Sequence, residues 1–300
     1  MTTPAIELHD LSKRYAGGRG LKPTTLRVER GEIFGFLGPN GAGKTTTIRT
    51  LLGFLRPTGG TAHVLGLDVA RESTTVRRRA GYLPGELNFD ASRTARDLLD
   101  FLGRLRGGVS RAYVHELAER LDLDPTRRIG VLSKGNKQKV GLVAALMSRA
   151  ELLILDEPTD GLDPLVQEEV RQLLREARTE GRTVFLSSHV LAEVDRIADR
   201  VGIIRGGELV TVASVQDVKA RLPHRLEFRF AAPVPETAFA HVSGVQDARV
   251  HGDTLTCTLT GSADALIKAV SAYTVLGVRG SDANLEDAFL TYYQEDPHVA

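Results

Sequence analysis

The chain has 300 residues, 42% of them hydrophobic, and a formal net charge of +1 at pH 7. That length suffices for one large domain or two smaller ones, and the near-zero charge creates no field that would attract nucleic acid or an anionic membrane surface. The single cysteine, Cys257, excludes an intramolecular disulfide and suits a reducing compartment. No apolar stretch approaches the roughly 18–20 residues that span a bilayer, and the first residues do not form a signal peptide. We therefore expect a cytoplasmic protein that reaches a membrane only through a partner.

The first predicted elements are short strands at residues 6–9 and 26–28, where apolar and polar residues alternate. Tyr15 lies between them, shortly before a pair of glycines. Taken alone, it fits two interpretations equally well. It is either an ordinary strand aromatic or a platform on which a base or an adenine ring stacks.

An apolar run at residues 33–37 predicts a buried strand, which a glycine-rich turn and a helix follow. Residues 38–45 fit the pattern G-x-x-x-x-G-K-[ST], which binds phosphate in this strand–loop–helix context. The glycines let successive backbone amides turn toward one point, and the helix N-terminus strengthens this anion site. Lys44 can then reach terminal phosphates, and the Thr45 hydroxyl can bind Mg²⁺. The competing interpretation is a glycine turn with an accidental lysine. The predicted binding residues are Gly38, Asn40, Gly41, Ala42, Gly43, Lys44, Thr45 and Thr46.

From about residue 86 to residue 149 the pattern becomes helical, which predicts a helical lobe of its own. Leu98, Leu102 and Leu105 are expected to share one face of the first helix. Ser110 can cap the next helix. A further helix opens at residues 132–136, where a serine and a glycine on their own fit a plain N-cap.

A continuous apolar strand at residues 151–155 ends in Asp156 and Glu157. Two adjacent carboxylates at the end of a buried strand are costly unless they have partners or a function. Asp163, followed by a proline, predicts a helix start. Another buried strand at 183–187 precedes His189, and strands at 201–204 and 208–212 form a predicted hairpin. Apolar strands that alternate with helices in this way predict an α/β fold with a mostly parallel sheet.

Beyond residue 223 the pattern changes to period two, at residues 226–230 and 254–259. Further strands are expected at 245–250 and 274–278, and helices at 263–271 and 284–293. This order suggests a small ferredoxin-like α+β module of the βαββαβ type with one additional helix. We therefore predict domains at residues 1–215 and 225–294, a linker at 216–224 and a tail at 295–300.

Taken together, six motifs resemble those of the nucleotide-binding subunits of ABC transporters, over about residues 4–215. Residues 38–45 resemble the Walker A motif, and residues 154–157 resemble the Walker B strand with its glutamate. Residues 132–138, LSKGNKQ, resemble the signature segment, and residues 160–163 resemble the D-loop. His189 takes the place of the family's switch histidine, and Tyr15 that of its adenine-stacking aromatic. The resemblance implies a P-loop NTPase cassette with a mostly parallel sheet, an antiparallel β part and a helical lobe.

The resemblance implies an ATPase that uses ATP and Mg²⁺. Lys44 and the loop amides would hold the β- and γ-phosphates, while Thr45 and Asp156 would position Mg²⁺. Glu157 would act as general base or orient the attacking water, and His189 would contact the γ-phosphate. Phosphoryl transfer to water depends mainly on such charge neutralisation and positioning.

The resemblance also implies two partners. Ser133 and Gly135, at a helix N-terminus, are placed to bind a γ-phosphate, and in the family that phosphate lies on a second subunit. Asp163, in the D-loop, is also expected to bind nucleotide. Because this chain carries one cassette, a head-to-tail dimer is expected. An integral membrane permease would hold that dimer at the inner face of the cell membrane, and no nucleic acid is expected.

The chain departs from the family pattern at two places. Lys134 and Asn136 replace a glycine and a glutamine of the signature segment, and Gly85 stands where most members have the Q-loop glutamine. Glu86 is a candidate substitute for that glutamine at the Mg²⁺ site; the competing interpretation is a solvated loop charge. These variants and the C-terminal extension resemble a bacterial group of exporters of the multidrug or antibiotic-resistance type.

Three functions are compatible with the sequence. The leading hypothesis is the ATPase subunit of an exporter for drugs, antibiotics or other small molecules or lipids. The second is a soluble ABC ATPase that acts on nucleic acid, against which the neutral charge and the lack of sustained heptads argue. The third is a regulatory cassette that binds ATP but turns it over slowly, with Gly85 as its mark.

Overall fold

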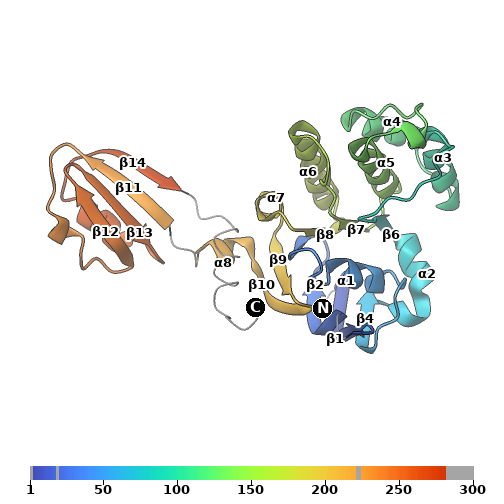
Figure 1. Cartoon of the computed structure of the whole chain (residues 1–300), viewed down its shortest axis with the longest axis horizontal. Coiled ribbons are helices and arrows are strands. Elements are labelled where there is room, and N and C mark those ends of the chain that lie inside the picture. Colours follow the sequence, from blue (N-terminus) through green and yellow to red (C-terminus); the bar gives the residue numbers. More distant parts are fainter. Residues whose placement is uncertain (1–2, 18–19, 221–223, 282–300) are drawn as a thin grey trace. The chain divides into compact units, whose positions relative to one another are not determined.

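The computed structural model describes residues 3–17, 20–220 and 224–281. The chain divides into two compact units, Met1–Val212 and Ala213–Ala300. Figure 1 labels most of the elements of each unit. In the described residues, no helix is both long and apolar enough to cross a membrane.

The central sheet of the first unit has six strands in the order β10-β9-β3-β8-β7-β6. The strands are β3 (Ile33–Leu37), β6 (Ala80–Leu83), β7 (Leu152–Asp156), β8 (Thr183–Ser188), β9 (Arg200–Arg205) and β10 (Glu208–Ser214). The neighbours from β9 to β6 pair in parallel, and β3, β7 and β8 are buried at every position. This confirms the predicted α/β fold, because strands covered on both faces read as continuous apolar runs.

A second, antiparallel sheet has the strand order β2-β1-β4-β5. Its strands are β1 (Ile6–Arg14), β2 (Gly20–Val28), β4 (Gly59–Val64) and β5 (Leu67–Asp68). Between the two sheets lies a core in which the ring of Phe185 contacts those of Phe34 and Phe36, at centroid distances of 5.8 and 5.4 Å. This packing fixes β3 and β8, whose carboxyl ends carry site residues.

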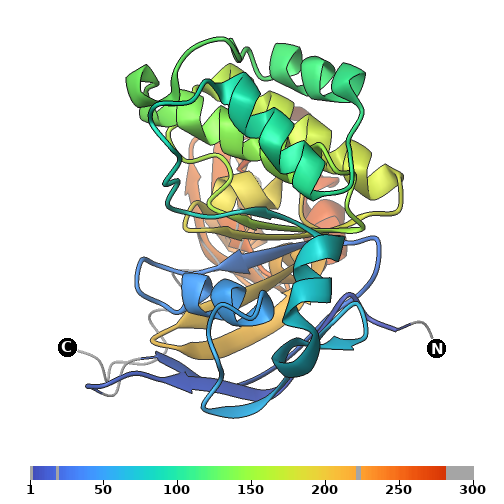
Figure 2. The ribbon, with the colours of Figure 1, turned by 90° about the vertical axis from the view of Figure 1, so that its right-hand side faces the viewer.

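Helices α3 to α6 lie together on one side of the central sheet, and α1 and the antiparallel strands lie on the other (Figure 2). The helices of this unit are α1 (Lys44–Leu51), α2 (Val69–Arg79), α3 (Ala95–Leu105), α4 (Arg111–Arg120), α5 (Lys134–Leu146), α6 (Pro164–Thr179) and α7 (Leu191–Asp195), with a 3₁₀ turn at Ile129–Val131. The side chains of Ser110, Ser133 and Asp163 accept amide hydrogen bonds at the starts of α4, α5 and α6. Serine and aspartate favour this N-cap position, because their side-chain oxygens can accept these hydrogen bonds.

One end of a predicted helix face is exposed. Leu98 and Leu99 of α3 are buried, but Leu105 is 68% exposed. Leu105 is the last residue of the helix.

The second unit contains α8 (Val215–Ala220) and a four-stranded sheet in the order β12-β13-β11-β14, with every pair antiparallel. Its elements are β11 (His224–Phe230), a 3₁₀ turn at Glu236–Ala238, β12 (Val245–His251), β13 (Thr254–Leu259), α9 (Asp264–Val270) and β14 (Val275–Ser281). The rings of Phe230, Phe239 and Tyr273 pack together in its core. Cys257 is 2% exposed there, and burial raises the pKa of its thiol.

The helix expected between the first two strands of this unit is absent from the described residues. Only the 3₁₀ turn at Glu236–Ala238 lies between β11 and β12. Pro233 and Pro235 precede or adjoin this turn and disfavour a helix that extends toward β11, because proline lacks an amide donor and disfavours helical geometry in the residue before it. The helix expected at 284–293 lies outside the described residues.

Candidate functional site

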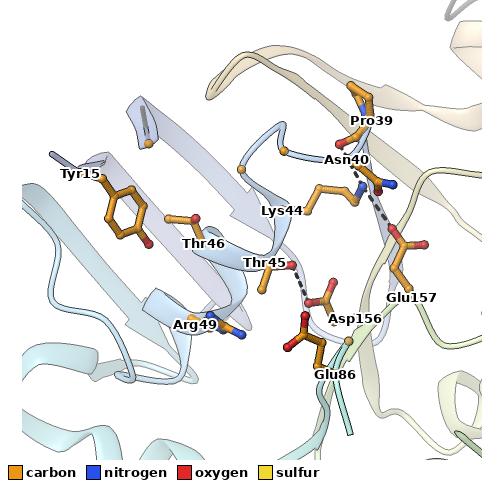
Figure 3. Close-up of a pocket in the computed structure, with 14 residues that line it drawn as sticks. Tyr15, Pro39, Asn40, Lys44, Thr45, Thr46, Arg49, Glu86, Asp156 and Glu157 are labelled. Atoms are coloured by element: carbon orange, nitrogen blue, oxygen red, sulfur yellow. Dashed lines mark hydrogen bonds and ion pairs between the residues drawn. The ribbon is translucent and has the colours of Figure 1, made fainter. Parts of the chain in front are cut away.

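The loop between β3 and α1 forms the floor of the site. Gly41 and Gly43 have φ of 80° and 112°, which side-chain-bearing residues rarely adopt. A Cβ at Gly43 would also lie 3.1 Å from the side chain of Ile204. The two glycines therefore allow the chain to turn tightly into α1, whose N-terminus faces the cleft (Figure 3).

A cleft of about 350 Å³ lies over this loop, a size typical of small-molecule sites. It brings together most of the predicted binding residues. Those that line it are Tyr15, Asn40, Gly41, Gly43, Lys44, Thr45, Thr46, Glu86, Asp156 and Glu157. Gly85 and Arg49 also line it, while Gly38 and Ala42 are buried in the loop itself.

Lys44 is only 6% exposed, and its ammonium group is held by oxygens. Its Nζ donates to the carbonyl oxygens of Gly38 at 2.5 Å and Pro39 at 3.3 Å. The same Nζ lies 3.1 Å from Glu157 Oε1. These contacts offset the cost of burying the charge and aim the ammonium group into the loop.

Asp156 lies at the carboxyl end of β7 and is 1% exposed. The Thr45 hydroxyl donates to its Oδ2 at 2.8 Å, and the Ser187 hydroxyl donates to its Oδ1 at 2.5 Å. The parallel register places Asp156 beside Ser187. Thr45 and Asp156 together present oxygen ligands of the kind that Mg²⁺ prefers.

Two neighbours complete the surroundings of Asp156. Burial, with a smaller contribution from the Asp156 charge, raises the pKa of Tyr82 to about 12, so its phenol stays neutral. A Cβ on Gly85 would lie 3.1 Å from Asp156 Oδ2. The described residues contain no group of three or more His, Cys, Asp or Glu side chains able to hold a metal. Mg²⁺ at this site would therefore need ligands from a bound phosphate as well.

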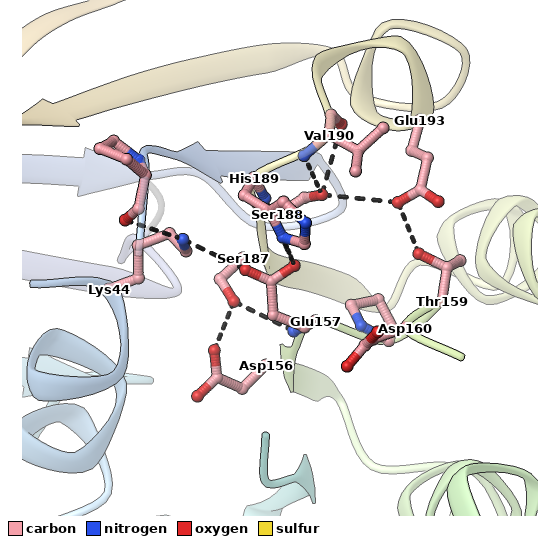
Figure 4. A network of polar contacts seen from close by, with 12 residues as sticks. Lys44, Asp156, Glu157, Thr159, Asp160, Ser187, Ser188, His189, Val190 and Glu193 are labelled. Atoms are coloured by element: carbon pink, nitrogen blue, oxygen red, sulfur yellow. Dashed lines mark hydrogen bonds and ion pairs between the residues drawn. The ribbon is translucent and has the colours of Figure 1, made fainter. Parts of the chain in front are cut away.

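Glu157 follows Asp156 in a left-handed backbone conformation, with φ of 51°. Its carboxylate lies between two cationic or potentially cationic groups (Figure 4). Oε1 faces Lys44 Nζ, and Oε2 lies 2.9 Å from His189 Nδ1 and accepts from the His189 amide at 3.3 Å. The structure thus brings together the predicted catalytic residues Lys44, Glu157 and His189.

Three other predicted residues lie outside this cleft. Ser133 Oγ accepts from the Asn136 amide at 3.2 Å, and Asp163 Oδ1 accepts from two amides in the first turn of α6. Gly135 lies in the first turn of α5. These residues cap helices or lie at helix starts, outside the cleft of their own chain. In the described chain they are therefore not placed to contact a nucleotide bound in that cleft.

Tyr15 follows β1 and is 40% exposed at the rim of the cleft. The Lys13 ammonium group lies 5.6 Å from the centre of its ring. The ring is therefore not part of the core, which disfavours the interpretation as an ordinary strand aromatic. Its stacking role stays a prediction.

Sequence reasoning missed three contacts. Ser187 holds Asp156, Gln138 donates to the carbonyl oxygen of Glu157 at 2.9 Å, and Lys134 pairs with Asp160 at 2.6 Å. A polar residue at the end of the strand 183–187 was a usable signal for the first. The other two join segments that are far apart in sequence, and no local pattern indicates them.

The chain is similar to known proteins along nearly its whole length. A protein-family model described as "ABC transporter" matches residues 21–160. The bacitracin transport ATP-binding protein BcrA of Bacillus licheniformis is 35% identical over 297 residues, which cover 95% of this chain and 96% of that protein. The daunorubicin resistance ATP-binding protein DrrA3 of Streptomyces coeruleorubidus is 34% identical, with coverage of 100% and 99%.

The solved dimeric structure of a bacterial ABC transporter cassette is similar in fold, with a TM-score of 0.63. It is 25% identical and covers 70% of this chain and 98% of that one. The two full-length relatives, the family model and the cleft geometry agree. The chain belongs to the ABC transporter family, as an ATP-binding subunit that hydrolyses ATP for transport.

Proposed function

We propose that this chain powers an exporter of drugs, antibiotics or other small or lipid-like molecules, together with a separate integral membrane permease. The observation that carries the proposal is the Lys44–Glu157–His189 cluster, which has the parts for ATP hydrolysis. The exporter assignment is supported by relatives named for bacitracin transport and daunorubicin resistance, which align with both units of the chain. Such a subunit would work in the cytoplasm, at the inner face of the cell membrane.

This proposal is tested by co-expression with a candidate permease, chosen as an integral membrane protein encoded by a neighbouring gene, and purification in detergent or lipid nanodiscs. The expected result is co-purification and Mg-ATP turnover that the permease stimulates. A chain that hydrolyses ATP but binds no membrane protein would favour the alternative of a soluble regulatory or nucleic-acid-related ATPase.

Thr45 and Asp156 would hold Mg²⁺, because their oxygens meet at the cleft and form a suitable ligand set. When bound there, Mg²⁺ neutralises phosphate charge and fixes the orientation of the terminal phosphates. Lys44 supplies the second positive charge toward those phosphates. Tyr15 would stack on the adenine ring at the rim of the cleft.

Glu157 changes partners during the reaction in this proposal. In the structure its carboxylate pairs with Lys44. A terminal phosphate competes for the same ammonium group, which releases Glu157 Oε1 to accept a proton from the attacking water or to orient it. The second oxygen stays with His189, whose ring would sense the γ-phosphate.

We also propose a head-to-tail dimer in which Ser133, Gly135 and Asp163 meet the nucleotide of the partner subunit. Their position outside their own cleft and the dimeric form of a related cassette support this assignment. The start of α5, with its amides and positive dipole end, suits a phosphate.

For the domain organisation, we propose a cassette at 1–215 with its helical lobe at 86–149, a linker at 216–224, an accessory domain at 225–294 and a tail at 295–300. All of helix α8 except its first residue, Val215, falls in the proposed linker. The strand order β12-β13-β11-β14 supports a ferredoxin-like arrangement, since the four strands, numbered along the chain, lie in the order 2-3-1-4.

Deleting residues 223–300 is expected to leave ATP affinity within about twofold of the full chain, since all nucleotide motifs precede residue 205 and the first unit has its own core. Nucleotide titration of both proteins is the measurement, with circular dichroism to verify folding. A folded truncated protein that fails to bind ATP would overturn this division of roles.

Replacing Glu86 with alanine is expected to cut turnover at least about tenfold, or roughly 1.4 kcal/mol of transition-state stabilisation. Its carboxylate points toward Asp156 and Thr45 (Figure 3), beside Gly85, which has no side chain to offer. ATP affinity should change little, and Glu86→Gln should retain more activity. Steady-state ATPase with the permease present is the measurement.

The matched control is Glu119→Ala. It removes an exposed carboxylate of α4, which is distant in sequence from the residues that line the cleft. If Glu86→Ala and Glu119→Ala both turn over ATP at the parental rate, Glu86 is a solvated loop charge. Gly85 then marks a site that works without a substitute for glutamine.

A further inference from the structure

Helix α5 holds the turn that carries Glu157. The turn runs from Glu157 to Gly161, between β7 and α6. Lys134 and Gln138 are four residues apart on α5, so they share one face of the helix. Both side chains contact this turn. Because α5 also packs against α3 and α4, it connects the helical lobe to the candidate catalytic carboxylate.

The first contact is buried. Gln138 is 5% exposed, and its Nε2 donates to the carbonyl oxygens of Glu157 at 2.9 Å and Pro158 at 3.2 Å. A buried carbonyl oxygen that loses its donor carries a desolvation cost. Gln138 therefore fixes the backbone at the residue whose carboxylate faces Lys44.

The second contact is exposed and charged. Lys134 Nζ lies 2.6 Å from Asp160 Oδ2, with 72% and 43% of the two side chains exposed. The helix and the turn also meet closely at two glycines, since a Cβ on Gly135 would lie 2.6 Å from the carbonyl oxygen of Gly161. A side chain at Gly135 would push the turn away from α5.

The turn needs such support because its backbone is strained. Glu157 has a φ of 51°, a conformation that persists in a non-glycine residue only where the surroundings fix it. Inside the turn, the Asp160 amide donates to the Glu157 carbonyl oxygen at 3.2 Å and the Leu162 amide donates to that of Thr159 at 3.2 Å. The first of these bonds ties Asp160 to Glu157, so a displacement of one residue reaches the other.

We propose that Gln138 and Lys134 are positioning residues for Glu157. Gln138 fixes its backbone, and Lys134, through Asp160, keeps the turn against α5. A displacement of α5 then carries the Glu157 carboxylate toward or away from the phosphate site. This inference rests on the proposed ATPase role of Glu157.

The first test uses the nucleotide-free protein and hydrogen–deuterium exchange. Gln138→Met keeps the length of the side chain but removes its donor, and Lys134→Met keeps the stem while removing the charge. We expect amides of residues 157–163 to exchange at least about threefold faster in Gln138→Met, with a smaller increase in Lys134→Met. Lys268→Met is the matched control, because Lys268 forms a similar exposed pair with Asp264, at 2.7 Å, in the second unit.

The second test is steady-state kinetics of the same full-length variants. Gln138→Met is expected to lower kcat at least about tenfold, and Lys134→Met about two- to fivefold, since exposed ion pairs are weak. KM for ATP should change less than about twofold in both, because neither residue lines the cleft. Asp160→Asn should match Lys134→Met, and the double variant should be no slower than the slower single variant.

The outcomes separate this inference from the proposed function. A parent protein without Mg-ATP turnover contradicts the proposed function, whereas an active parent whose variants keep the parental exchange and kcat contradicts the positioning role. If Lys134→Met changes KM while Asp160→Asn does not, Lys134 acts on a nucleotide directly and the inference is wrong for that residue. Recovery of kcat in Lys134→Arg would support the charged link.

Discussion

Glu157→Gln is expected to stop turnover while ATP still binds. The amide keeps the shape of the carboxylate, so Lys44 and His189 stay in place, but it is a poor proton acceptor. The loss of kcat should reach at least about a hundredfold, or about 2.7 kcal/mol of transition-state stabilisation. The substitution also removes the negative charge that competes with a terminal phosphate for Lys44 Nζ, 3.1 Å away. ATP affinity should therefore be unchanged or higher.

An ATP-bound dimer should accumulate in this variant, because the step that would open it no longer occurs. Sizing chromatography with and without Mg-ATP measures the dimer, and phosphate release measures turnover. Glu180→Gln serves as the control, since Glu180 is an exposed carboxylate that pairs with Arg149. A Glu157→Gln protein that stays monomeric and hydrolyses ATP at the rate of the control would contradict the role given to Glu157.

Lys44→Ala is expected to abolish hydrolysis and to weaken ATP binding at least about tenfold, or about 1.4 kcal/mol. Lys44 is the cation of the loop, and carbonyl oxygens of Gly38 and Pro39 aim it inward. Without the lysine, the negative charges of two phosphates and of the Glu157 carboxylate lie in a partly buried cleft and lack the ammonium group that neutralises them. Titration with a fluorescent nucleotide and steady-state ATPase assays measure the two effects.

Lys22→Ala is the control for the loss of a lysine, because Lys22 forms an exposed pair with Glu208 on the outer strands. Thermal unfolding should differ little between the two variants. If the folded Lys44→Ala protein hydrolyses ATP like Lys22→Ala, the assignment of residues 38–45 as the phosphate-binding loop fails.

Features that depend on local chemistry were predictable from the sequence. The buried strands β3 and β7 are apolar apart from Gly35 and the terminal Asp156, and β8 has an apolar centre at residues 184–186. The caps Ser133 and Asp163 stand directly before their helices. The positions of Asp156 and His189 follow from the same logic, since residues after neighbouring parallel strands meet at one edge of the sheet.

Features that depend on packing between distant segments were not predictable. Strand β1 extends to Arg14, but the sequence predicted only its start. Register shifts after Leu8 and Leu11 break the alternation of apolar and polar residues beyond that point. The 68% exposure of Leu105, at the end of α3, is likewise not set by the helical pattern alone. The contact of Gln138 with Glu157 joins residues 19 apart through a helix and a strand, whose packing no single segment determines.

The burial of Cys257 makes the chain convenient for thiol chemistry. It is the only cysteine, it is almost fully enclosed, and its raised pKa keeps the unreactive thiol form dominant. A maleimide should not react with Cys257 while the second unit is folded. A cysteine introduced on α5 or in the turn at residues 157–161 could then be labelled with a spectroscopic probe without removal of Cys257. Under mild denaturant, the same thiol would become accessible when the sheet of the second unit opens, and its labelling would report the stability of that unit separately from the cassette.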